Sequence, residues 1–170
     1  MQKDALIRRV RIWIALFVVG LVLSGATAFP LGIESRWLDR FLHGTAWPIA
    51  SHLPWAVSWI DQVSAGLTAT YATYPFVAYG TDWLAFAHLM IAVAFYGPYR
   101  DPVRNIWVIQ FGLIACLGVI PLALICGPLR YIPAWWTPID ISFGVFGAIP
   151  LLVVYRLIKR IESIGVAAGS

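Results

Sequence analysis

The sequence predicts an all-α fold: an integral membrane four-helix bundle with interfacial helices in a long outer loop. Of its 170 residues, 61% are hydrophobic and only 12% are charged. Soluble domains have about 45–50% apolar and about 25% charged residues, so this chain needs lipid around it. Four stretches are long enough, at about 20 apolar residues each, to cross about 30 Å of hydrocarbon. Basic residues gather in the short segments that bound them.

The predicted spans are residues 12–33, 81–99, 106–126 and 139–158 of a single transmembrane domain, 1–170. Loops rich in Lys and Arg stay in the cytoplasm. We therefore expect a cytoplasmic inner loop at 98–105, both termini on the same side, and a flexible tail at 164–170. Most of the 12 basic residues then fall on the cytoplasmic side: Lys3, Arg8, Arg9, Arg11, Arg100, Arg104, Arg156, Lys159 and Arg160.

The first apolar stretch resembles a secretory signal, because basic residues precede it and the small-residue sequence Ala26-Thr27-Ala28 follows. Its apolar run of about 20 residues is longer than the 7–15 residues of a signal core. We expect it to be retained as the first span.

The segment 34–80 is predicted to lie outside, and it is rich in aromatic residues. Trp and Tyr favour the headgroup level of a bilayer. We expect one or two interfacial helices here, with Pro48 and Pro54 as breakers. A fifth span at 53–69 would place Arg100 and Arg104 outside, against the charge rule. A partly re-entrant arrangement stays open.

Prolines and small residues predict details of the remaining helices. Pro102 and Pro138 suit the first positions of the third and fourth spans, and Gly127 can end the third. Small residues four apart allow two helix backbones to approach closely. Two such pairs occur, Gly20 with Ser24 and Gly144 with Ala148.

His88 is the most informative polar residue, because it lies within the hydrocarbon part of a predicted span. Intramembrane ionisable residues usually face the bundle and carry a function. A neutral imidazole can ligate a haem iron or a chlorin magnesium, bind another metal, or relay a proton. The structural alternative is a hydrogen bond across helices, for example to Gln110, to Ser142 or to a backbone carbonyl.

Asp82 and Asp140 start their predicted helices at the same membrane level. Each can cap a helix N-terminus and interact with the positive end of its dipole. Alternatively, one of them pairs with Arg130 and closes the mouth of an outer-facing cavity. The ligand-binding cluster predicted there also includes three tryptophans, Trp83, Trp135 and Trp136.

His43, His52 and His88 share the predicted outer half, and with an aspartate they can form a metal site of three nitrogens and one oxygen. The local spacing that marks catalytic zinc sites, such as HExxH, is absent. Two interfacial histidines that face water are the alternative. The sequence therefore requires no metal and no cofactor.

Three segments carry a resemblance to known sequences: AYGTDWLAFAH at 78–88, GPYRDPVRN at 97–105 and IDISFGVFG at 139–147. They resemble small bacterial four-span integral membrane proteins with no assigned activity. The resemblance covers about residues 75–160. It implies a bacterial inner (cytoplasmic) membrane and transfers no catalytic residue.

The sequence contains no GxSxG elbow, no phosphate-binding glycine loop and no CxxCH motif. We therefore expect a non-enzymatic protein that binds a lipid or apolar small molecule in an outer-facing pocket, or that is an accessory subunit of a membrane complex. One alternative is an intramembrane enzyme or cofactor protein that uses His88 with Asp82 and Asp140. A second is proton or ion conduction by an oligomer. Membrane lipids are the expected partners, together with a homo-oligomer or larger complex, and no nucleic acid.

Overall fold

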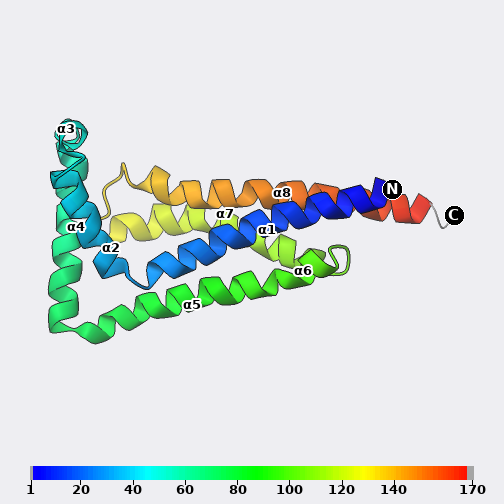
Figure 1. The fold of residues 1–170 in the computed structure, drawn as a ribbon, viewed down its shortest axis with the longest axis horizontal. Coiled ribbons are helices and arrows are strands. Elements are labelled where there is room, and N and C mark those ends of the chain that lie inside the picture. The colour runs from blue at the N-terminus through cyan, green and yellow to red at the C-terminus, as the bar shows by residue number, and fades with distance from the viewer. Residues whose placement is uncertain (1, 168–170) are drawn as a thin grey trace. The chain divides into compact units, whose positions relative to one another are not determined.

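The computed structural model describes residues 2–167, with the side chains of residues 3–164, and this part of the chain is helical without any strand. The predicted all-α class is therefore confirmed. Figure 1 shows the elements in order: α1 (Gln2–Ala28), α2 (Leu31–His43), α3 (Trp47–Ala50), α4 (Pro54–Thr73), the 3-10 helix η1 (Pro75–Val77), α5 (Ala78–Ala94), α6 (Tyr96–Arg100), α7 (Ile106–Leu129) and α8 (Thr137–Ala167).

Four helical stretches in the described residues are long and apolar enough to cross a membrane: Lys3–Ala28, Pro75–Arg100, Ile106–Leu129 and Thr137–Ile164. Each overlaps one predicted span. Large apolar side chains on these helices stay exposed, among them Leu16, Leu117 and Phe146 at 57%, 66% and 68%. A surface of this kind needs an apolar solvent, as expected of a multi-pass membrane protein.

The chain forms two compact units. The terminal unit contains the residues up to Gly20 and those from Ile91 onward, and the central unit is Leu21–Met90. The core of the terminal unit brings together residues of α1, the end of α5, α6, α7 and α8. Its largest fully buried side chains are Phe95, Ile14, Ile109, Leu151, Ile158, Val10, Val154 and Pro98.

In the terminal unit, α7 and α8 are antiparallel and packed closely at glycines. A Cβ on Gly144 of α8 would lie 2.5 Å from the carbonyl oxygen of Cys116, and one on Gly112 of α7 would lie 2.8 Å from Leu151 Cδ1. Real Cβ atoms do not approach so closely, so the backbone contact at Gly144 admits only glycine, whereas a larger residue at Gly112 would have to displace the Leu151 and Phe95 side chains.

In the central unit, α2 and α4 are an antiparallel pair. Gly32 at the start of α2 lies against the ring of Tyr71, and His43 at the end of α2 faces Asp61. Within this unit α4 runs across the direction of α5 (Figure 1). Although α4 has 20 residues, it is not among the candidate spans found in the described part of the chain.

The predicted end of the first span is wrong, because α1 ends at Ala28 rather than at residue 33. Pro30 has no N–H to continue the helical ladder. Its carbonyl oxygen instead accepts the N–H groups of Ile33 and Glu34, at 2.7 and 3.0 Å, and so starts α2. The end of the predicted span therefore belongs to the next helix.

The predicted start of the third span at residue 106 is confirmed, but Pro102 is not its first helical position, and the span ends later than predicted. Residues 102–105 form a turn in which the Asn105 amide donates to the carbonyl oxygens of Gly97 and Asp101, at 3.2 and 2.9 Å, so α7 starts only at Ile106. At its other end α7 continues past Gly127 to Leu129. Of the predicted tail 164–170, α8 includes the residues up to Ala167, and 168–170 lie outside the described residues.

Candidate functional site

An open groove of about 440 Å³ lies between α7 and α8 in the terminal unit. This volume is within the about 300–1,000 Å³ typical of small-molecule sites. Two charged residues, Arg130 and Asp140, line it together with apolar or small side chains: Val119, Leu122, Ala123, Cys126, Gly127, Ile132 and Phe143. The groove is therefore apolar along its length and charged where α7 ends and α8 begins.

The turn after α7 places Arg130 and Ile132 at this groove. Tyr131 has φ of 58°, in the left-handed region. The N–H of Ile132 donates to Gly127 O at 3.0 Å and that of Tyr131 to Pro128 O at 3.1 Å. This pair of bonds is a Schellman motif, which caps the last carbonyls of a helix. It turns the chain back so that residues on both sides of Tyr131 line one groove.

The structure places the two predicted aspartates differently. Asp140 is the fourth residue of α8, so it does not cap the helix as predicted, but its negative charge lies in the first turn and interacts favourably with the helix dipole. Asp82 lies in the second turn of α5, because helical structure already begins at Ala78, so the prediction that Asp82 caps this helix is wrong. Within the described residues, Arg130 and Asp140 line one groove without forming an ion pair.

The predicted outer cluster is divided between the two units. Arg130, Asp140 and the tryptophan pair belong to the terminal unit, where the rings of Trp135 and Trp136 make an edge contact with centroids 5.5 Å apart. Asp82, Trp83 and His88 belong to the central unit. There Trp83 makes edge contacts with Tyr79 and Phe86 at 5.9 and 5.8 Å and is 56% exposed. Their joint action in one pocket stays a prediction.

His88 makes its hydrogen bond within its own helix. Its Nδ1 lies 2.8 Å from the carbonyl oxygen of Leu84, one turn earlier. Since a carbonyl only accepts, Nδ1 carries the proton and Nε2 keeps its lone pair. The acceptor is thus a backbone carbonyl, one of the predicted types, but the bond stays within α5 and does not cross to another helix. The Cβ of His88 lies close to Gly25 of α1, where a built Cβ would be 3.0 Å from it.

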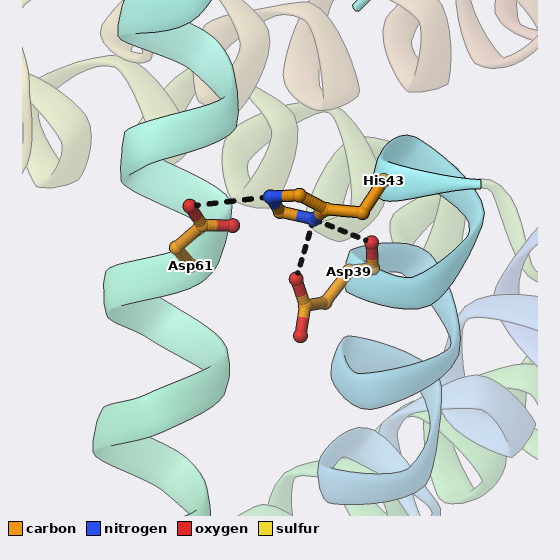
Figure 2. A group of neighbouring side chains, drawn as sticks. All are labelled: Asp39, His43 and Asp61. Carbon is orange, nitrogen blue, oxygen red and sulfur yellow. Dashed lines mark hydrogen bonds and ion pairs between the residues drawn. The ribbon is translucent and has the colours of Figure 1, made fainter. Parts of the chain in front are cut away.

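Figure 2 shows a second polar site, in which Asp39 and His43 of α2 face Asp61 of α4. His43 Nδ1 lies 3.0 Å from the carbonyl oxygen of Asp39 and 3.1 Å from its Oδ1. On the other side of the ring, Nε2 lies 3.7 Å from Asp61 Oδ2. The imidazole is thus held between two carboxylates from different helices.

The sequence pattern of α2 explains why its polar groups face α4. Gly32, Ser35, Asp39 and His43 recur at helical spacing, and the first two are buried. The opposite stripe is apolar and exposed, with Ile33, Trp37 and Phe41 at 64%, 65% and 42%. The helix α2 thus has an aromatic face and, opposite to it, a polar face with Asp39 and His43.

The two carboxylates change the protonation of His43. The hydrogen bond to the Asp39 carbonyl and the charges of Asp61 and Asp39 raise the pKa of His43 above its ordinary value of 6.5. Only one carboxylate oxygen of Asp61, Oδ2, lies near His43. The other, Oδ1, is buried and has no hydrogen-bond partner in the described structure. A buried carboxylate oxygen without a donor is unusual and costs about 1–3 kcal/mol.

The metal set predicted from three histidines is not the one that the structure assembles. Among the described residues, the one group with metal-ligand spacing is Asp39, His43 and Asp61. His52 is exposed and contacts Ser51, and His88 lies on α5. The sequence did contain a signal for Asp39, because it is four residues before His43 on one helix. The sequence held no such signal for Asp61, because its position next to His43 depends on the pairing of α2 with α4.

The other end of the terminal unit is basic. Lys3, Arg11 and Arg100 line a groove of about 760 Å³ there, together with Asp101 and Glu162. The Arg11 guanidinium donates to the carbonyl oxygen of Tyr99 at 3.1 Å and lies over the Tyr99 ring. The start of α1, the 98–105 loop and the end of α8 thus meet at one end of the unit.

These features define the class of the molecule, an all-α chain with four candidate membrane spans and polar groups in discrete clusters. The chain matches no protein-family model, and comparisons with curated proteins and with solved structures gave no match. The arguments about function therefore depend on the geometry of its own residues.

Proposed function

We propose that this chain is a non-enzymatic membrane protein that binds a phospholipid in the groove between α7 and α8. The observation that carries the proposal is the chemistry of this groove, an apolar channel with Arg130 and Asp140 at one end. A phospholipid has the complementary form, with acyl chains joined to a phosphate. Arginine binds phosphate through several N–H donors at once.

Asp140 adds a preference for the headgroup. A carboxylate accepts hydrogen bonds, so it matches an ammonium or hydroxyl group attached to the phosphate. Phosphatidylethanolamine and phosphatidylglycerol carry such donors, whereas phosphatidylcholine has none. Phosphatidylethanolamine and phosphatidylglycerol are therefore the proposed ligands, with the phosphate at Arg130 and the headgroup donor at Asp140.

The groove faces the outer leaflet in this proposal, and both termini are cytoplasmic in a bacterial inner membrane. Support comes from the collection of Lys3, Arg11 and Arg100 at one end of the terminal unit, opposite to Arg130 along α7. Basic residues are retained on the cytoplasmic side. In the central unit, the exposed aromatic stripe of α2 suits a helix that lies in the outer interface.

Cys126 provides a local test, because it is exposed and lines the groove. In delipidated protein carrying Cys116→Ala, the alkylation rate of Cys126 is measured with each lipid added. Phosphatidylethanolamine and phosphatidylglycerol should slow alkylation more than phosphatidylcholine. Arg130→Gln should remove most of this protection, and Arg130→Lys should retain part of it because the positive charge remains.

Two variants serve as controls for this test. Arg104→Gln removes a charge from the 98–105 loop and should leave protection unchanged. Leu122→Trp should slow alkylation without lipid by filling the groove, and it should abolish any further effect of lipid. Equal protection by all three lipids, unaffected by Arg130→Gln, would show that Cys126 is covered only by unspecific lipid or detergent.

A cofactor held by His88 is the second candidate, favoured by its free Nε2. An Nδ1–H donated to a backbone carbonyl fixes a histidine as an Nε2 ligand in many metal sites. Purified protein should then show a stoichiometric metal or a visible absorption band that is lost in His88→Ala. Colourless, metal-free protein of normal stability would eliminate this candidate.

A further inference from the structure

We propose that Asp39, His43 and Asp61 bind one divalent first-row transition metal ion, of the type of Zn²⁺, where α2 packs against α4. One ligand atom from each of the three residues lies within 4.8 Å of the other two. Ligands about 2.1 Å from one ion are separated by at most about 4.2 Å. Binding therefore requires the ligand atoms to draw together, and the Asp39 carboxylate, which lies 3.1 Å from His43 Nδ1, has to turn toward the ion at Nε2.

The ring of His43 already has the orientation that a metal ligand needs. Its Nδ1 donates to the carbonyl oxygen of Asp39 at 3.0 Å, which leaves the lone pair on Nε2. The Trp47 ring lies nearly parallel to the imidazole, with centroids 5.7 Å apart. Nε2 faces the carboxylate of Asp61 (Figure 2).

The distance between His43 and Asp61 suits an ion better than a direct bond. At 3.7 Å, Nε2 and Oδ2 are too far apart for a good hydrogen bond. Two ligands with this separation would bind a shared ion at an angle of about 124° when each bond is about 2.1 Å. This angle falls within the range of four- and five-coordinate sites.

Asp61 supplies an independent second observation. Its Oδ1 is buried and has no hydrogen-bond partner in the described structure. Such an atom calls for an ion or a water. A cation bound by both oxygens of Asp61 would satisfy it, and the ion would complete its coordination with water because the site is half-exposed.

The ligand types select the class of ion. One imidazole with two carboxylates suits Zn²⁺ or Co²⁺, whereas Ca²⁺ and Mg²⁺ prefer oxygen ligands alone. The ion would join α2 to α4 and so hold together the helix pair of the central unit. This inference is independent of the proposed lipid site, which lies in the terminal unit.

Zn²⁺ binding by the whole chain tests the proposal. Tag-free protein with Cys116→Ala and Cys126→Ala is treated with EDTA, transferred to metal-free detergent buffer, and titrated calorimetrically with ZnCl₂. We expect one ion per chain and an increase in Tm on binding. His43→Ala, Asp61→Asn and Asp39→Asn should each weaken binding at least about tenfold, and CaCl₂ should not replace ZnCl₂.

His52→Ala is the matched control, because it removes an exposed histidine of the same segment that lies outside the site. It should bind Zn²⁺ as the parent does. Absence of binding, equal loss in His52→Ala, or full affinity in Asp61→Asn would each overturn the proposal. If His43→Ala does not fold, the two half-exposed aspartate variants decide the question, with far-ultraviolet circular dichroism as the check on folding.

Discussion

Gly144 of α8 lies directly against the carbonyl oxygen of Cys116 on α7, so that a Cβ built on the glycine would be 2.5 Å from that oxygen. The contact is with backbone, which cannot rotate away as a side chain can. The two helices must therefore separate to accept any other residue. The closeness of α7 and α8, which defines the groove between them, depends on this glycine.

Gly144→Ala should lower the stability of the terminal unit by about 1–3 kcal/mol, the usual cost of overpacking. The change is measured as a decrease in Tm in detergent, followed by circular dichroism. Gly118→Ala on α7 is the control, since nothing lies within 4 Å of a Cβ there. Alanine favours helix over glycine by up to about 1 kcal/mol, so this control should be neutral or stabilised. A Gly144→Ala protein as stable as the control would contradict the contact.

The sequence was sufficient for features that depend on local pattern. Hydropathy placed all four candidate spans, and the spacing of Gly144 and Ala148 indicated a close helix contact. The sequence was not sufficient for contacts that depend on which helix packs against a given residue. A Cβ on Gly20 would meet nothing within 4 Å, whereas Gly25 packs on α5 through Ala85 and His88. Spacing identifies small residues but not the helix that they face.

The polar sites likewise include one that local sequence predicts and one that depends on helix pairing. Arg130 and Asp140 were predicted at one cavity mouth, and both line the α7–α8 groove, because one short turn connects their helices. The histidine cluster was different. His43 faces Asp61 rather than His52 or His88, since the antiparallel pairing of α2 with α4 determines which residues meet. No motif in the sequence records that pairing.

Tyr131→Gly should stabilise the protein. Tyr131 holds φ of 58° at the left-handed position of the Schellman motif, where a residue with a Cβ is strained by about 1–2 kcal/mol. The greater freedom of glycine in the unfolded chain offsets about 0.5–1 kcal/mol, so the expected net gain is up to about 1 kcal/mol. Because Tyr131 is 91% exposed, little packing is lost with its side chain.

The measurement is Tm in detergent for Tyr131→Gly and for Tyr131→Ile. The β-branched isoleucine tolerates the left-handed region poorly, so this variant should be less stable than the parent. If glycine and isoleucine shift Tm in the same direction, the left-handed turn is not what limits stability at this position.

The pairing of His43 with its carboxylates should make the metal-free protein less stable as the pH rises. The pKa of His43 is raised above 6.5 by the Asp39 carbonyl and by the charges of Asp61 and Asp39. Folding therefore favours the protonated ring. The stabilisation is complete below pH 6.5, the unfolded value, and is lost as the pH rises through the higher folded pKa.

Thermal unfolding of EDTA-treated protein between about pH 5 and about pH 8 measures this effect. His43→Gln keeps a polar side chain without a titrating charge, and it should flatten the dependence of Tm on pH. His52→Gln is the matched control and should leave the dependence as in the parent. An unchanged slope in His43→Gln would place the titrating group elsewhere.

The orientation predicted from charge should appear in labelling of intact cells. The 98–105 loop meets the basic start of α1 at one end of the terminal unit, and such residues stay in the cytoplasm. With both native cysteines replaced, Thr45→Cys in the segment between α2 and α3 should react with an impermeant maleimide in intact cells. Val103→Cys should react only after the cells are permeabilised. The reverse pattern would turn the α7–α8 groove toward the cytoplasm, whereas the zinc and lipid titrations of purified protein would be unaffected, so that orientation and binding are decided separately.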